Sequence, residues 1–286
     1  AVNPSVIYVF DLGVSNGVAL YGAAFRDNTS GTLVLTPGVG SVQGAVVIEA
    51  PDPAAVIAGF AASFRSRIDQ ASPVPADGFS FNWATDLTNG TVAQAEEGSG
   101  SGLSVCFDLF DNGGGEGPAI DVKWRGQLVA RLPVAAADLV AASNWVEVLV
   151  RLNPDGVLDV VYNCRSVFTR QVVTGFVPQV GARFSFAART GGSWARHSLD
   201  DIAIEVYPQP VLNLSAIMFT NTARRVTMQA GPVGVAADVP ALYRFQRSTD
   251  MVHWVDIGPV ILAPGTSEIL IDTNDAAPRA FYRGVR

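Results

Sequence analysis

Short apolar runs, and runs that alternate between apolar and polar residues, recur along the whole chain between turn signals. Alternation with a period of two residues is typical of half-buried β-strands, and short continuous apolar runs are typical of buried ones. The pattern therefore predicts a protein built almost entirely from β-strands. In the first 207 residues the predicted strands are Ser5–Phe10, Thr32–Leu35, Gly44–Ile48, Gly78–Trp83, Leu103–Phe107, Trp145–Leu152, Val157–Tyr162, Arg183–Ala187 and Ile202–Val206.

Explicit turn sequences separate several of these strands. The segment Asn153-Pro154-Asp155-Gly156 lies between two predicted strands, so we expect a hairpin there. Helical signal is limited to two short stretches in which a proline precedes small and apolar residues. These stretches are Pro53–Ala58 and Pro133–Ala142.

A domain boundary is predicted at Tyr207-Pro208-Gln209-Pro210. Prolines on alternate residues favour an extended segment and remove backbone hydrogen-bond donors. The two predicted domains are residues 1–207 and 208–286. The strands of the second are typical in number and length of a small immunoglobulin-like or fibronectin-like sandwich. They are Arg225–Gln229, Ala241–Ser248, Trp254–Ile257, Ser267–Ile271 and Ala280–Val285.

Composition supports two folded domains and excludes several partner classes. The chain has 286 residues, of which 49% are hydrophobic and 16% charged, so an intrinsically disordered chain is excluded. The net charge is 19 − 26 = −7, and Lys123 is the only lysine, which argues against nucleic acid and anionic membranes as partners. No apolar run reaches the ~20 residues of a membrane-spanning helix, so membrane insertion is not expected.

The start of the chain and its cysteines bear on where the protein works. The sequence begins with Ala1, which fits a secreted protein after removal of a signal peptide and equally a trimmed chain. We expect a secreted or cell-surface protein. Cys106 and Cys164 could pair in an oxidising compartment or be two small buried apolar residues, and the sequence leaves both open. The two histidines, His197 and His253, stand apart, which excludes a zinc site built from several histidines.

The densest polar chemistry surrounds a glycine-rich loop after one predicted strand. Asp108, Asp111, Asn112 and Glu116 supply oxygen atoms at short spacing, with no nitrogen or sulfur ligand beside them in this loop. Hard oxygen ligands in a flexible loop suit calcium. The alternative is an ordinary polar loop in which Asp and Asn stabilise turns.

A series of motifs in this part of the chain resembles the legume-type (L-type) lectin domain of the concanavalin A-like superfamily. The family pattern is A-D-G-F-x-F, a glycine loop, V-x-E-F-D-T-x-x-N and I-x-I-D-V. The matching segments are Ala76–Phe81, Gly98–Gly102, Val105–Asn112 and Ala119–Val122. The resemblance covers about residues 1–207 and implies a concanavalin A-like jelly-roll sandwich, so the predicted fold class is all-β: this jelly roll followed by the smaller immunoglobulin-like sandwich.

The resemblance also implies a carbohydrate site. Asp77 would accept hydrogen bonds from two sugar hydroxyls, and Gly100, or a neighbouring loop glycine, would donate a backbone N–H. Phe110 would provide an aromatic platform for the apolar face of the sugar. Asn112 would bind a hydroxyl through its amide and help to hold calcium. The Ala76–Asp77 peptide is cis in the family, and we expect it to be cis here.

The metal ligands of the family are matched only in part. The resemblance assigns calcium to Asp108, the Phe110 carbonyl, Asn112 and Glu116, with Glu97 or Asp111 as extra ligands. The glutamate that binds a second, transition metal is replaced by Cys106, and the histidine position falls near Gly117. A bound transition metal is therefore not expected.

Three functions follow in order of preference. The first is a secreted carbohydrate-binding protein, assisted by calcium, whose partner is a glycan or polysaccharide. The second is a structural or adhesive cell-surface protein that uses the jelly roll as a scaffold and forms homo-oligomers, for example through Phe281–Val285 as an edge strand. The third is a glycan hydrolase or lyase. It is disfavoured because Asp108 has no acidic partner at i−2, i+2 or i+4, as paired-carboxylate hydrolysis requires.

Overall fold

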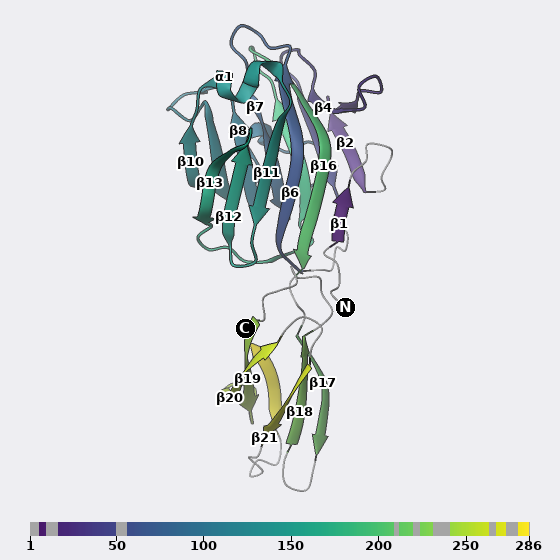
Figure 1. Ribbon diagram of the computed structural model, residues 1–286, viewed down its shortest axis with the longest axis vertical. Helices are drawn as coiled ribbons and strands as arrows, with labels where there is room; N and C mark the ends of the chain where they lie inside the picture. Colours follow the sequence, from purple (N-terminus) through teal and green to yellow (C-terminus); the bar gives the residue numbers. More distant parts are fainter. Residues whose placement is uncertain are drawn as a thin grey trace. The chain divides into compact units, whose positions relative to one another are not determined.

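The computed structural model describes residues 6–9, 17–49, 56–208, 212–219, 224–230, 241–262, 267–272 and 280–285. It divides into two compact units, which are described separately here. The larger contains Ile7–Val206, and the smaller contains Tyr207–Arg286 together with Ala1–Val6, which the sequence assigned to the first domain (Figure 1). This division falls close to the proline pair at residues 208 and 210. The boundary at 207/208 between two independent domains stays a prediction.

Two antiparallel sheets form the larger unit. The seven-stranded sheet has the order β10-β9-β8-β7-β15-β5-β2, and the nine-stranded sheet has the order β13-β12-β11-β6-β16-β4-β3, with β1 beside β16 and β14 beside β6. The strands of the first sheet are β2 (Val18–Gly22), β5 (Gln43–Ile48), β7 (Gly78–Ala84), β8 (Leu103–Asp108), β9 (Ala119–Trp124), β10 (Gln127–Pro133) and β15 (Arg183–Arg189). Those of the second are β1 (Val6–Val9), β3 (Phe25–Arg26), β4 (Leu33–Thr36), β6 (Val56–Asp69), β11 (Val146–Leu152), β12 (Val157–Tyr162), β13 (Arg165–Val172), β14 (Gln179–Val180) and β16 (Arg196–Pro208).

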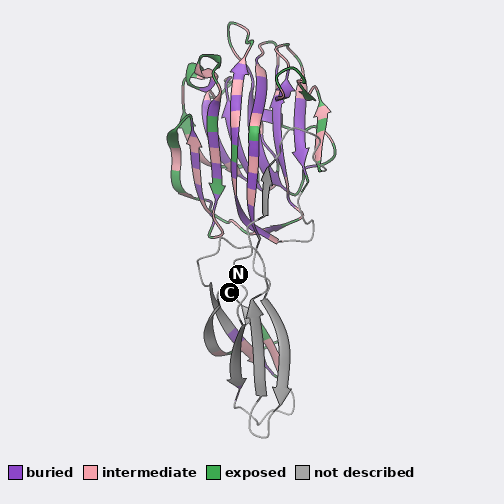
Figure 2. Cartoon of the chain, turned by 45° about the vertical axis from the view of Figure 1, so that its right-hand side comes forward, coloured by how far each residue is buried: buried purple, intermediate pink, exposed green. Residues whose placement is uncertain are grey.

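The core of this sandwich lies between the two sheets, because alternate residues of each strand point inward. Phe60 of β6 is fully buried and contacts rings of the opposite sheet, with centroid distances of 5.6 Å to Phe81, 5.5 Å to Trp83 and 5.2 Å to Phe184. Figure 2 shows buried residues along the central strands of the larger unit. The predicted all-β sandwich is confirmed.

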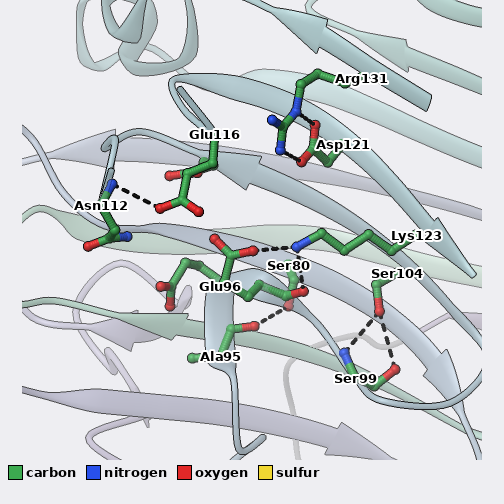
Figure 3. Close-up of polar contacts among 12 residues, drawn as sticks. Ser80, Ala95, Glu96, Ser99, Ser104, Asn112, Glu116, Asp121, Lys123 and Arg131 are labelled. Carbon is green, nitrogen blue, oxygen red and sulfur yellow. Dashed lines mark hydrogen bonds and ion pairs between the residues drawn. The ribbon is translucent and has the colours of Figure 1, made fainter. Parts of the chain in front are cut away.

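The other face of the seven-stranded sheet carries polar residues that are also buried. Asn82 donates to Ser80 Oγ at 2.8 Å and to Ser185 Oγ at 3.2 Å, and it accepts from Ser104 Oγ at 2.7 Å. The segment 85–102, which includes the short 3₁₀ helix η1 (Ala95–Glu97), covers this face. The Ser80 hydroxyl donates to the Ala95 carbonyl at 2.6 Å and fixes η1 over the sheet (Figure 3).

The structure contains the predicted hairpin and one of the two predicted helices. The hairpin at residues 153–156 joins β11 to β12, with Gly156 N–H donating to the Asn153 carbonyl at 2.9 Å. The Pro133–Ala142 stretch contains α1 (Ala136–Val140), and η2 (Ala141–Ser143) follows it. The expected helix at Pro53–Ala58 is wrong from Val56 onward, because the long strand β6 begins there; its first three residues lie outside the described ranges.

The structure bears on the pairing of the two cysteines and on membrane-spanning helices. Cys106 is buried in β8 and Cys164 is exposed after β12, and both are free thiols. No helix in the described ranges is both long and apolar enough to span a bilayer.

The smaller unit contains two three-stranded antiparallel sheets, with orders β17-β18-β21 and β20-β19-β22. Its strands are β17 (Leu212–Phe219), β18 (Arg224–Ala230), β19 (Ala241–Ser248), β20 (Val255–Leu262), β21 (Ser267–Asp272) and β22 (Phe281–Val285). Five of these overlap the strands expected from the sequence. The immunoglobulin-like assignment of this unit stays a prediction.

Candidate functional site

Asp77 is held by backbone hydrogen bonds at the ends of two neighbouring strands. Its N–H donates to the Arg189 carbonyl at the end of β15 at 3.1 Å, and its carbonyl accepts from Leu109 N–H just after β8 at 2.8 Å. The Ala76–Asp77 peptide is cis, as expected. The Asp77 side chain is 9% exposed, so this is a buried acidic group at the edge of a sheet.

The glycine-rich loop after β8 brings further polar groups to the same edge. Asp108 Oδ1 accepts a hydrogen bond from Phe110 N–H at 2.9 Å, which turns the chain out of the strand. Asn112 N–H donates to Glu116 Oε1 at 2.9 Å and closes the loop (Figure 3). Asp111 Oδ1 accepts the N–H of Gly113 at 2.8 Å.

An open pocket at this edge contains three of the four predicted carbohydrate-binding residues. Asp77, Phe110 and Asn112 line it together with four residues from the end of β15 and the following turn, namely Arg189, Gly191, Gly192 and Ser193. A Cβ placed on Gly191 would lie 3.5 Å from Asp77 Oδ2, so the backbone of this turn lies beside the carboxylate. The structure thus joins segments that are far apart in the sequence.

Gly100 lies elsewhere. It lines a different pocket, formed by the 86–100 segment, and its N–H donates to Asp86 Oδ2 at 2.9 Å. The glycines beside Asp77 are Gly191 and Gly192 instead. Neither glycine was singled out from the sequence, although both lie in a turn sequence, Thr190-Gly191-Gly192-Ser193, a few residues after the predicted strand Arg183–Ala187.

Arg189, which lines the pocket, and the buried Glu96 behind it were not singled out from the sequence. Arg189 Nε lies 3.6 Å from Asp77 Oδ2, and Arg189 Nη2 forms an ion pair with Glu96 Oε1. Glu96 belongs to η1 and is fully buried. Neither residue lies in a sequence motif. Their contact joins β15 to η1, which lies far from it in the sequence, so no local pattern predicts it.

Burial dominates the electrostatics of these carboxylates. Burial raises the pKa of Asp77, and the Arg189 guanidinium acts in the opposite direction. Burial also raises the pKa of Glu96 to about 7, again against the effect of Arg189. Burial raises the pKa of Asp108 to about 7, and the nearby charges of Glu97 and Glu96 add to the increase. These carboxylates are therefore held in surroundings that disfavour their charged forms.

The predicted calcium ligands partly converge. A Cβ placed on Gly117 would lie 2.6 Å from Asp108 Oδ2 and 2.8 Å from the Phe110 carbonyl oxygen, so these two oxygens border one small space that glycine leaves open. Asp108 forms no ion pair within the described residues, and a cation there would supply the missing charge. No group of three or more His, Cys, Asp or Glu side chains in the described ranges is arranged to hold a metal. The predicted calcium ligands are not such a group, because two of the four are the Phe110 backbone carbonyl and the Asn112 side-chain amide.

The position expected for the second metal is occupied by uncharged and internally paired groups. Cys106 is buried, and burial strongly raises the pKa of its thiol, which favours the neutral form. Asp121, opposite Cys106 on β9, forms an ion pair with Arg131 (Figure 3). Lys123 forms an ion pair with Glu97. Of the charged groups around Cys106, Asp121, Lys123 and Glu97 therefore already have partners.

Comparison with solved structures identifies the fold of the larger unit. A lectin from Bauhinia forficata in complex with GalNAc has a TM-score of 0.55 at 16% identity, covering 71% of this chain and 98% of that lectin. Lectin I-B4 from Griffonia simplicifolia, in a metal-free form, has a TM-score of 0.57 at 16% identity, covering 71% and 99%. The exoplasmic/lumenal domain of VIP36, bound to Ca²⁺ and Man3GlcNAc, has a TM-score of 0.52 at 16% identity, covering 73% and 88%. No family model and no curated protein sequence matches the chain. The chain therefore contains the concanavalin A-like jelly roll of the legume lectins and VIP36.

Proposed function

We propose that this protein binds carbohydrate through the pocket lined by Asp77, Phe110 and Asn112, and that it acts outside the cell or at the cell surface. One observation carries the proposal: a buried carboxylate lines one open pocket together with an aromatic residue and a side-chain amide from a loop distant in the sequence. A saccharide presents hydroxyls that donate and accept hydrogen bonds, together with an apolar C–H face. The pocket offers a partner for each.

The similar solved structures support this proposal through their fold and their printed ligands. One contains GalNAc and another contains Man3GlcNAc with Ca²⁺. All those compared here are called lectins or are domains with a bound glycan, and none is named as an enzyme. The proposal is accordingly a binding protein with no catalytic residues.

We further propose that calcium assists binding. Asp108, the Phe110 carbonyl, Asn112 and Glu116 would hold the ion, and its charge would offset that of the buried Asp108. Because Phe110 and Asn112 belong to both the calcium loop and the pocket, an ordered loop would place their side chains for the sugar. Calcium would act on binding through the loop.

A glycan array tests the proposed function. Wild-type protein and Asp77→Ala should be applied with calcium and with a chelator, after circular dichroism has shown that the variant is folded. We expect wild type to bind a defined set of glycans, more weakly with the chelator, and Asp77→Ala to lose binding. No binding of wild type to any glycan under either condition would rule the function out.

A second candidate function, self-association at a surface, is favoured by the place of β22. This strand is at the edge of its three-stranded sheet, with β19 as its neighbour. An edge strand can add a strand from another chain. Size-exclusion chromatography with light scattering tests this, and a strict monomer at high concentration would contradict it.

A further inference from the structure

Arg189 connects the candidate site to a buried carboxylate beneath it. It is the last residue of β15 and pairs in register with Gly78, next to Asp77. Its Nε lies 3.6 Å from Asp77 Oδ2, and its Nη2 forms an ion pair with Glu96 Oε1. Two contacts on different nitrogens fix both the position and the plane of the guanidinium.

Part of the guanidinium remains available to a ligand. Arginine carries five N–H donors, and the two contacts engage only Nε and Nη2. In the described part of the chain, Nη1 has no hydrogen-bond partner. The Arg189 side chain is 41% exposed and lines the pocket beside Asp77. A molecule in the pocket would therefore meet charged donors next to a carboxylate.

Glu96 is built as an anchor for this arginine. It is 0% exposed, and the helix that carries it is fixed to β7 by the Ser80–Ala95 hydrogen bond. Glu96 Oε1 pairs with Arg189, while Oε2 is buried with no hydrogen-bond partner among the described residues. A buried carboxylate with one charged partner holds that partner firmly, since separating them would leave an unpaired charge.

The charges around the pocket define the class of ligand. Asp77 and Glu96 supply two carboxylates against the single guanidinium of Arg189, so an acidic sugar would bring a third carboxylate into a partly buried space. A neutral sugar avoids this cost, because a hydroxyl can donate to Asp77 and accept from Arg189 at the same time. Resting on the carbohydrate-binding function, we propose that Arg189, anchored by Glu96, contacts the ligand, and that the two carboxylates beside its single positive charge make the pocket select neutral saccharides over acidic ones.

Binding to matched panels of neutral and uronate-bearing oligosaccharides, in calcium buffer, tests this selectivity. At pH 8.5, above the Glu96 pKa of about 7, Glu96→Gln removes one negative charge and should raise the ratio of acidic to neutral affinity on the order of tenfold. The double variant Glu96→Gln/Arg189→Met removes the donor without leaving Glu96 as a buried unpaired charge, and should weaken neutral binding about tenfold. Glu49→Gln is the matched control, because Glu49 pairs with Arg183 of the same strand but does not line the pocket.

The outcomes separate this inference from the function on which it rests. Wild type should bind neutral oligosaccharides and not acidic ones, and Glu49→Gln should keep that ratio. If wild type binds glycans but Glu96→Gln leaves the ratio unchanged, or the double variant binds as wild type does, the role of Arg189 is overturned while the function stands. If wild type prefers acidic oligosaccharides, the neutral selectivity is overturned. If wild type binds neither panel, the function fails together with the inference.

Discussion

Arg189 and Asp77 are joined twice: the Asp77 N–H donates to the Arg189 carbonyl at 3.1 Å, and Arg189 Nε lies 3.6 Å from Asp77 Oδ2. The backbone hydrogen bond fixes the Asp77 backbone beside the end of β15. The side-chain contact places a positive charge beside the Asp77 carboxylate. Burial raises the pKa of Asp77, and Arg189 opposes that shift. The arginine therefore helps to keep an ionised acceptor in the pocket.

The stability of the metal-free protein should fall as pH rises from about 5 to about 8. Burial raises the pKa of Glu96 from 4.5 to about 7 and that of Asp108 from 3.8 to about 7, so the folded state holds these protons more tightly than the unfolded state. Their contribution is fully present below the unfolded pKa values and is lost as pH passes through the folded ones. Urea denaturation in chelator at several pH values measures this.

Glu96→Gln provides the control for that pH dependence. The amide cannot ionise, so the variant should show a shallower fall in unfolding free energy over the same range. Asp27, whose pKa is lowered to about 2 by Arg196, changes stability only in more acidic solution. Burial lowers the pKa of His197 to about 3, which opposes the fall below about pH 6.5 equally in wild type and variant. A wild-type unfolding free energy that is constant or increases between pH 5 and pH 8 would contradict the prediction.

Calcium should raise the melting temperature of the protein at pH 7.5. An ion that binds only the folded state stabilises it in proportion to the logarithm of its concentration above Kd. Asp108→Asn should abolish this increase, whereas Asp155→Asn, a hairpin carboxylate that accepts from Val157 N–H, should keep it. Thermal denaturation with calcium or chelator decides, and identical wild-type melting temperatures in both would argue against a calcium site.

Phe60→Ala should be severely destabilising. The ring is fully buried and contacts Phe81, Trp83 and Phe184 across the two sheets, so truncation leaves a cavity that costs about 3–5 kcal/mol. Phe25→Ala is the comparison, because Phe25 is 40% exposed, and should change stability by less than about 1 kcal/mol. Urea denaturation gives both values, and equal losses would show that Phe60 does not join the sheets.

Asn82→Ala should loosen the segment 85–102 from the seven-stranded sheet. Asn82 bonds the hydroxyls of Ser80, Ser104 and Ser185, and its loss leaves buried polar groups unsatisfied at about 1–3 kcal/mol. Limited proteolysis should show faster cleavage within 85–102. The variant Asn28→Ala, which changes an exposed residue, should be cleaved at the wild-type rate. Unchanged cleavage in Asn82→Ala would mean that other contacts hold the segment.

Elements specified by local chemistry could be predicted from the sequence. The β11–β12 hairpin follows from Asn153-Pro154-Asp155-Gly156, whose residues favour a turn. The next hairpin, from β12 to β13, was not predicted. It turns at Asn163 and Cys164, both at positive φ, and cysteine carries no turn signal. The tertiary structure overrides local preference in such places.

The residues of the candidate site were likewise predictable from the sequence only where a local motif specifies them. Asp77, Phe110 and Asn112 belong to motifs with fixed spacing, and the structure brings them to one pocket. Gly100 was chosen from a neighbouring glycine-rich motif, but the fold places it beside Asp86 instead. The Arg189–Glu96 pair has no local pattern, because its contact depends on how segment 85–102 crosses the sheet.

The central claim is that the pocket around Asp77 binds saccharide. Calorimetric titration of Asp77→Asn and Asp86→Asn with a glycan that wild type binds tests it most directly, since each variant removes one carboxylate from one of the two pockets between which the structure divides the predicted carbohydrate-binding residues. We predict that Asp77→Asn abolishes the heat of binding and that Asp86→Asn retains the wild-type Kd. Wild-type affinity in folded Asp77→Asn would contradict the account.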